Sequence, residues 1–341
     1  MKSLELIIVQ FNEVERLIAI GRVPQLRLAY ILLDSAVELI MHRMAKSELD
    51  GERYPFAQLE NLRRIETGSD RVFRAERQRL GADWLRAEIE KLEATVVSKR
   101  RRSKIDREFA EKIDFLIGRG RLPNDLGPVL KKLHEYRNET YHRDHHRIEV
   151  IRPAVLVYVD AACTVLENYE PDTLISGDFD KPLGPELALL HEDLPTPRDL
   201  FQLPHLAAKQ LREAVQLDLN AVRSALGEHL LARLADLQDN IAYVEENLTG
   251  RDVIPGDAIL AMQIQDGDAE AIFDPEVMRS RNYPLTMNDL RSWVERATAL
   301  ESMSDKHALF TEFAAIEDCF EKVEQVARKA VWDIDEQANW R

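Results

Sequence analysis

The strongest constraint on the fold is a stripe of apolar residues at helical spacing in the second half of the chain. Ten steps take the stripe over 37 residues, from Leu211 to Leu248, so that the mean step is 3.7 residues. An α-helix has this period, whereas a strand buried on one face alternates every second residue. The spacing predicts one helix of about 40 residues, roughly 60 Å long, with Gly250 as its C-terminal cap. The stripe consists of Leu211, Val215, Leu219, Val222, Leu226, Leu230, Leu234, Leu237, Ile241, Val244 and Leu248.

Such a helix must bury its stripe against other elements of the chain or against a second copy of itself. Helical patterns near residues 286–302 and 305–332 provide partners within the chain. Residues 250–285 are rich in glycine and proline and are predicted as loops. This half carries no catalytic signature, and its role stays open.

Helical periodicity also dominates the first half. Apolar residues recur four and three apart from Leu26 to Met44, directly after Pro24, which is tolerated in the first turn of a helix. No stretch alternates as a half-buried strand would. We therefore predict an all-α protein, with a helical bundle at residues 1–170 and an acidic, long-helix, coiled-coil-like domain at residues 205–341. Six of the 14 prolines lie in residues 171–204, which predicts a linker there.

The net charge of −15 is divided unevenly along the chain. Residues 1–170 carry 30 Lys and Arg against 28 Asp and Glu, a net of +2, and residues 171–341 carry 16 against 33, a net of −17. A polyanion is therefore expected to meet the first half, because phosphates are bound by cations that displace counterions. The acidic half would serve solubility, cover a basic cleft as a brake, or be a docking surface for a partner.

The start of the chain and its cysteines bear on its location. The apolar start LELIIVQ is short and soon interrupted by Glu13 and Glu15, which fits neither a signal peptide nor a membrane span. Two cysteines, Cys163 and Cys319, do not make a disulfide framework. We expect a cytoplasmic protein with no membrane partner.

The most unusual segment is LHEYRNETYHRDHHR, residues 133–147, which holds four histidines and three arginines. Arg137, the polar Asn138 after it and His142 five positions on resemble the R-x4-6-H motif of ribonucleases of the HEPN superfamily (higher eukaryotes and prokaryotes nucleotide-binding). The context is similar too, because the motif ends one expected bundle helix and another apolar helix follows. The resemblance covers about residues 1–170.

The resemblance implies a HEPN-like bundle and a metal-independent endoribonuclease that needs no cofactor. The 2′-hydroxyl of RNA would attack the adjacent phosphate and leave 2′,3′-cyclic phosphate and 5′-hydroxyl ends. It further implies a toxin or anti-phage defence effector, restrained by an antitoxin or another regulatory protein. Tyrosine two residues after the histidine, found in a subset of HEPN toxins, is replaced here by Asp144. Regulation through that tyrosine is therefore not expected.

The residue types suit this chemistry. A histidine such as His142 can accept the proton of the 2′-hydroxyl or protonate the leaving oxygen. Arg137 can hold the phosphate and stabilise charge in the transition state, with Asn138 as an orienting polar group. On one helix Arg137 and His142 lie about 140° apart, so a single straight helix does not aim both at one phosphate. Either the helix ends near the motif, or two copies share the site across a two-fold axis. The family resemblance implies the second arrangement, a homodimer with a composite cleft.

A basic run precedes the motif and is expected to grip the RNA backbone without reading its sequence. A solvated helix end is the alternative reading of this run. The predicted RNA-binding residues are Lys99, Arg100, Arg101, Arg102, Lys104 and Arg143.

Other interpretations of the motif remain open. Glu139, His142 and His146 share a helical face and could bind a metal, although no second Glu-x-x-His completes a dinuclear site. The basic residues of the motif could also be present only because positive side chains interact favourably with the dipole at the C-terminus of a helix. At the level of function, the alternatives are a non-catalytic HEPN-like module for dimerisation or nucleotide or nucleic-acid binding, and a helical scaffold.

Overall fold

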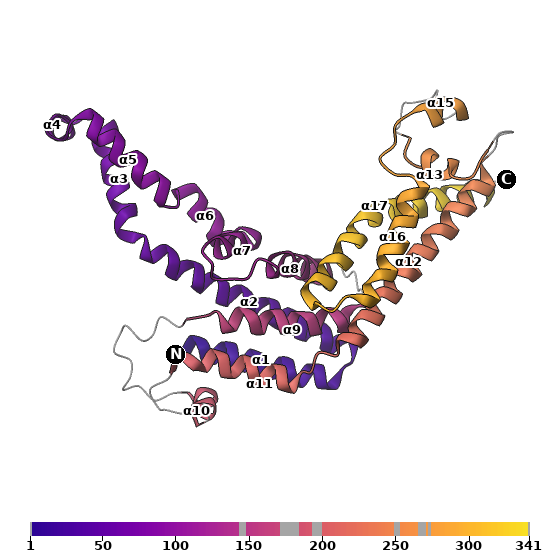
Figure 1. Cartoon of the computed structure of the whole chain (residues 1–341), viewed down its shortest axis with the longest axis horizontal. Coiled ribbons are helices and arrows are strands. Elements are labelled where there is room, and N and C mark those ends of the chain that lie inside the picture. Colours follow the sequence, from indigo (N-terminus) through magenta and orange to yellow (C-terminus); the bar gives the residue numbers. More distant parts are fainter. Residues whose placement is uncertain are drawn as a thin grey trace. The chain divides into compact units, whose positions relative to one another are not determined.

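The computed structural model describes residues 2–142, 148–170, 184–192, 200–248, 253–264, 271 and 274–339, and every regular element in them is helical (Figure 1). The predicted all-α class is confirmed. Two compact units are present, one of residues 1–145 and 158–216 and the other of residues 146–157 and 217–341. Within the described ranges, no helix is both long and apolar enough to cross a membrane.

Unit 1 is built on an antiparallel pair, α1 (Lys2–Ile20) and α2 (Val23–Gly51). Gly21 between them has φ 69°, a left-handed conformation that glycine adopts without strain. Pro24 lies in the first turn of α2, as expected. Helices α7 (Phe109–Gly118) and α8 (Leu126–His142) pack on α2. Helix α9 (Ile151–Glu167) follows, and its residues from Tyr158 on belong to unit 1. Their shared core includes the fully buried Leu33, Ile40, Ile113, Leu133 and Val165.

Helices α10 (Pro185–Glu192) and α11 (Leu203–Ala214) both pack on α1 and thus belong to unit 1. Helix α10 lies inside the segment predicted as a linker and buries Leu187 and Leu190. Arg212 on α11 fixes that helix to α9, where it bonds Thr164 at 2.9 Å and pairs with Asp160 at 3.2 Å. The units therefore divide near residue 217 and not at the expected linker. Residues 171–183 and 193–199 of that linker lie outside the described ranges.

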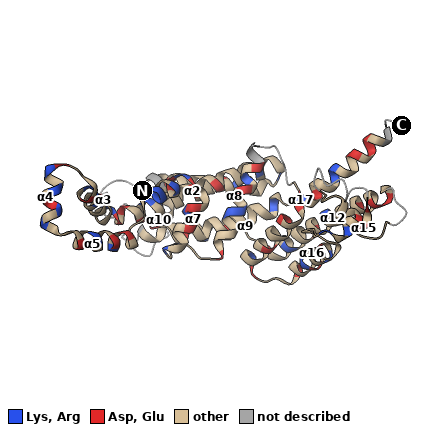
Figure 2. Ribbon diagram, turned by 90° about the horizontal axis from the view of Figure 1, so that it is seen from above, with Lys and Arg blue, Asp and Glu red and all other residues tan. Residues whose placement is uncertain are grey.

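Three helices of unit 1 form a separate layer, which we call the arm: α3 (Arg53–Thr67), α4 (Arg71–Leu80) and α5 (Ala82–Thr95). The arm has an apolar core of its own. Four of the ten residues of α4 are arginines (Figure 2), and Arg77 among them donates to the carbonyl of Gly68 at 2.7 Å. The core residues are Leu59, Leu62, Ile65, Leu85, Ile89, Leu92 and Val96.

Unit 2 contains α12 (Leu219–Asn247), α13 (Asp257–Ala261), α15 (Pro275–Ser280), α16 (Met287–Ala299) and α17 (Lys306–Asn339), with the short 3-10 helix η4 (Leu300–Ser302). The stripe of α12 packs against α16 and α17. These are the two helices predicted near residues 286–302 and 305–332 as partners within the chain. The buried stripe residues of this helix are Val222, Leu226, Leu230, Leu234, Leu237, Ile241 and Val244.

The prediction of one helix from Leu211 to Leu248 was wrong. The chain leaves the helix at Val215 and begins a new one after Asp218, whose Oδ1 accepts the backbone N–H groups of Asn220 and Ala221 at 3.0 and 3.2 Å. An aspartate cap satisfies amides that a new helix leaves unpaired, so it stabilises a break that the apolar period does not reveal. The proposed cap Gly250 lies outside the described ranges.

A buried acid makes unit 2 sensitive to low pH. Asp257 accepts hydrogen bonds from Arg279 at 2.9 and 2.5 Å and from the N–H of Ile254 at 3.0 Å. These bonds, Arg279 first, hold the pKa of Asp257 below its ordinary value. Stabilisation is thus present above the unfolded pKa of about 3.9 and is lost as pH falls through the lower, folded pKa.

We expect Asp257→Asn to flatten the acid dependence of unit 2. Thermal unfolding followed between pH 6 and pH 2 should show a steeper loss of stability for the wild type than for the variant. Parallel curves for the two proteins would contradict the role of this pair.

Candidate active site on helix α8

Helix α8 is anchored by one face and leaves a second face half-buried. Its apolar residues lie in the core of unit 1, and the hydroxyl of Tyr30 on α2 donates to the carbonyl of Leu133 at 2.7 Å. This bond fixes the rotation and height of α8 against α2. The polar side chains of the half-buried face therefore meet one residue of α2, Asp34. The anchoring residues are Leu126, Val129, Leu130, Leu133 and Tyr136.

The side chain of Asp34 has no exposed surface. Its Oδ1 accepts from the hydroxyl of Tyr158 on α9 at 2.6 Å and lies 2.9 Å from Nδ1 of His134. Its Oδ2 lies 3.3 Å from Nε of Arg137. A buried carboxylate is costly unless it is paired and hydrogen-bonded. Three helices thus meet at one charge, and we call these four residues the Asp34 cluster.

His134 and Arg137 are three residues apart on α8 and share a face. Their side chains are 21% and 24% exposed, so each reaches from the buried carboxylate toward the surface. The imidazole stacks on the ring of Phe109, with centroids 3.8 Å apart and planes 8° from parallel. The ring of His134 is therefore fixed both by a carboxylate and by an aromatic face.

Tyr158 is fully buried and remains a donor. Burial, with the charge of Asp34 next, raises the pKa of its hydroxyl well above the ordinary value. The ring of Tyr30 meets that of Tyr158 edge to face at 5.2 Å. Tyr158 therefore keeps its proton across the physiological range and donates it to Oδ1 of Asp34.

The structure brings together two of the three predicted catalytic residues. A terminal nitrogen of Arg137 donates to Oδ1 of Asn138 at 2.9 Å. Helix α8 continues to His142, its last residue, but the side chain of His142 lies outside the described part, as does Arg143. The predicted metal site also lies outside the described part, because it needs the side chains of His142 and His146.

The predicted RNA-binding run begins helix α6 (Lys99–Arg107), and one of its members turns inward. Arg102 donates to the carbonyls of Val97 and Leu49 at 3.0 and 3.1 Å and to Glu52 at 2.6 Å. Its guanidinium also lies 4.3 Å from the ring centroid of Phe56. Arg102 therefore ties α6 to the end of α2 and to the root of the arm.

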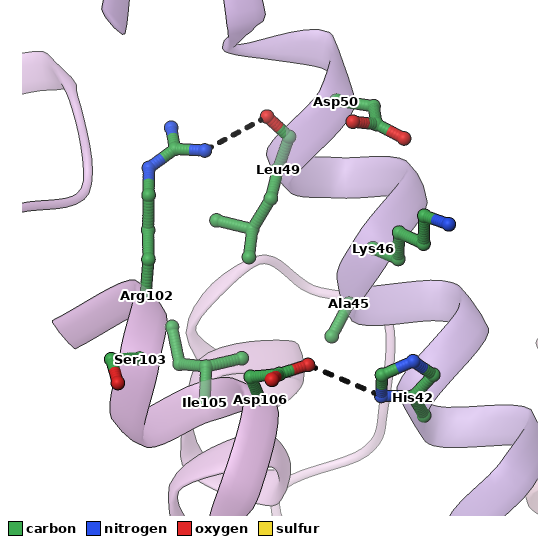
Figure 3. Close-up of a pocket in the computed structure, with 9 residues that line it drawn as sticks. All are labelled: His42, Ala45, Lys46, Leu49, Asp50, Arg102, Ser103, Ile105 and Asp106. Atoms are coloured by element: carbon green, nitrogen blue, oxygen red, sulfur yellow. Dashed lines mark hydrogen bonds and ion pairs between the residues drawn. The ribbon is translucent and has the colours of Figure 1, made fainter. Parts of the chain in front are cut away.

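Beside Arg102 lies a cavity of about 450 Å³ between α2 and α6 (Figure 3). Lys46 and Asp50 line it together, and His42 faces Asp106 at 3.8 Å. The lining carries charges of both signs, so the cavity lacks the uniform positive potential that a phosphate group would select.

The other members of the run lie nearer the surface. Lys99, Arg100 and Arg101 are exposed, and Lys104 pairs with Glu111 at 3.5 Å. An exposed pair of this kind is weakly held, so Lys104 stays accessible to an anion. The contact of the basic run with RNA stays a prediction.

Asp34 and Tyr158 were missed by the sequence reasoning, and His134 was not among the predicted site residues. One signal was present: Asp34 interrupts the apolar face that runs through Tyr30, Leu33 and Val37. A lone acid at such a position needs a buried partner. Comparison of the chain with protein-family models, with curated proteins and with solved structures finds no match in any of the three.

Proposed function

We propose that this protein is a metal-independent endoribonuclease that cleaves RNA through attack of the 2′-hydroxyl on the adjacent phosphate. The observation that supports the proposal best is the setting of Arg137. Asp34 faces its Nε at 3.3 Å and Asn138 accepts from a terminal nitrogen, while the side chain stays 24% exposed. A guanidinium held in this way is oriented before a phosphate arrives, which favours transition-state stabilisation.

The second part of the proposal is a homodimer with a composite site. Helix α8 is unbroken from Leu126 to His142, so positions 137 and 142 point about 140° apart. His142 would therefore act on a phosphate held by Arg137 of the other copy, across a two-fold axis. A role as a toxin or defence effector in the cytoplasm, restrained by an antitoxin or another regulatory protein, belongs to the same proposal.

Cleavage of mixed cellular RNA in EDTA tests this function. We expect the wild type to leave 2′,3′-cyclic phosphate ends and Arg137→Ala and His142→Ala to lose activity by about 10²-fold or more. Arg86→Ala is the matched control, because Arg86 is an exposed arginine on α5. It should cleave as the wild type does.

Equal cleavage by all four proteins would assign the activity to a contaminant or to another site. RNA binding without cleavage by the wild type would favour the non-catalytic module. One observation favours this alternative: Arg137 already faces a carboxylate of its own chain, Asp34, and does not need a phosphate as its counter-charge.

A further inference from the structure

The Asp34 cluster contains a histidine that the proposed mechanism does not use. His134 shares a face of α8 with Arg137 and Asn138, whereas position 142 lies about 140° from Arg137. A phosphate bound by Arg137 within one chain therefore meets His134 first. The imidazole is 21% exposed, enough for one edge of the ring to reach a ligand.

Asp34 and Phe109 together determine how that ring is presented. The buried carboxylate lies 2.9 Å from Nδ1, and an ionised carboxylate can only accept, so Nδ1 carries the proton. In neutral His134 the lone pair is then on Nε2, at the opposite side of the ring. Among the described residues no side chain or backbone group bonds Nε2. Stacking on Phe109 at 3.8 Å prevents the ring from tilting away.

We infer that His134 is the general base of this site and that Asp34 is its positioning residue, an inference that rests on the proposed ribonuclease function. Nε2 takes the proton of the 2′-hydroxyl as the 2′-oxygen forms its bond to phosphorus. The bond from phosphorus to the 5′-oxygen breaks, and that oxygen takes a proton from a general acid, for which the sequence offers His142. His134 then releases its proton to water, and the products are a 2′,3′-cyclic phosphate and a 5′-hydroxyl.

This assignment gives each histidine a separate task. Arg137 holds the phosphate and His134 on the same face of α8 is the base, while the general acid is the part that the proposed function gives to His142. The base is pre-oriented by a buried charge, as general bases are in hydrolases that pair a carboxylate with an imidazole. The two tasks can be separated by experiment because they act on different oxygens of the substrate.

The test uses the full-length protein and an oligonucleotide with a single ribonucleotide, made with either oxygen or sulfur as the 5′ bridging atom. A thiolate leaves without help from an acid, so the sulfur substrate relieves the loss of a general acid and not of a base. In His134→Asn the side-chain amide replaces Nδ1–H as donor to Asp34 but offers nothing at the position of Nε2. We expect this variant to keep the wild-type Tm and to lose about 10²–10⁴-fold in rate on both substrates.

The companion variant is His142→Ala, which should lose a similar factor on the oxygen substrate and recover on the sulfur substrate. Recovery of His134→Asn on sulfur would overturn the assignment as base. Wild-type rates for His134→Asn, with Arg137→Ala inactive, would overturn the role of His134 and leave the proposed function standing. A wild type that cleaves neither substrate would overturn the proposed function itself.

A second readout is independent of activity. Nitrogen NMR of histidine-labelled protein, with His134→Asn to assign the signal, should show a protonated Nδ1 and an unprotonated Nε2 for neutral His134. Asp34→Asn should shift this ring toward the other tautomer, because an amide can donate to Nδ1. A neutral ring with its proton on Nε2 in the wild type would contradict the assignment whatever the enzyme does.

Discussion

Replacement of Asp34 by alanine is expected to cost about 3–5 kcal/mol of the free energy of unfolding of unit 1, since removing one partner of a buried ion pair leaves the other charge uncompensated. The carboxylate has no exposed surface and serves His134, Arg137 and Tyr158 at once. After the substitution, Arg137 keeps its charge beside a small apolar hole. Urea denaturation followed by circular dichroism measures the change.

Two further variants isolate the charge from the hydrogen bonds. Tyr158→Phe removes a single donor to Asp34 and should cost about 1–3 kcal/mol. The double variant Asp34→Ala/Arg137→Met should be more stable than Asp34→Ala alone, because it also removes the cation that faced the carboxylate. A loss below about 1 kcal/mol for Asp34→Ala would mean that the cluster does not anchor the bundle.

The second large effect is expected in unit 2, where Arg233 on α12 faces two acids of α17. Glu317 is fully buried and Glu324 is nearly so, and Arg233 bonds both, at 2.7 Å in the case of Glu324. The guanidinium also lies 4.8 Å from the ring centroid of Phe320. Arg233→Met keeps much of the aliphatic stem but leaves two buried carboxylates without this cation. We expect a loss of about 3–5 kcal/mol.

Arg328→Met is the matched control for this experiment. Arg328 also bonds Glu324, at 2.9 Å, but its side chain is 63% exposed, so the loss should stay below about 1 kcal/mol. Thermal unfolding of the two variants separates them. Equal losses would show that burial does not set the strength of these pairs. In a triple variant, apolar residues at 233, 317 and 324 together should restore most of the stability.

The positions of most helices follow from apolar periodicity, because that period decides which faces are buried. The stripe of α12 and the face of α2 are examples. Where helices begin is decided by single polar groups, and here the sequence reading failed at Asp218. Proline was misread for a related reason. Residues 171–204 were read as a linker, yet Pro185 begins α10, since a proline is tolerated at the first helical position.

The candidate site was predictable only along one helix. Arg137 and Asn138 are consecutive in the sequence, and their side chains bond one another. The contact between Arg137 and Asp34 spans 103 positions of the sequence, and the contact between Asp34 and Tyr158 spans 124. Both depend on how three helices pack. In the basic run, a helix turns each successive side chain by 100°, so the inward direction of Arg102 depends on the packing of α6 and not on its composition.

The contact between Asp34 and Tyr158 has a consequence for the order of biosynthesis. The carboxylate is made first, and the hydroxyl that completes its surroundings is made 124 residues later. At about 5–20 residues per second, this separation corresponds to roughly 6–25 s of translation. During that interval the carboxylate of Asp34 lacks the hydroxyl donor that Tyr158 supplies. The polar core of unit 1 is therefore complete only after α9 has been made and has docked.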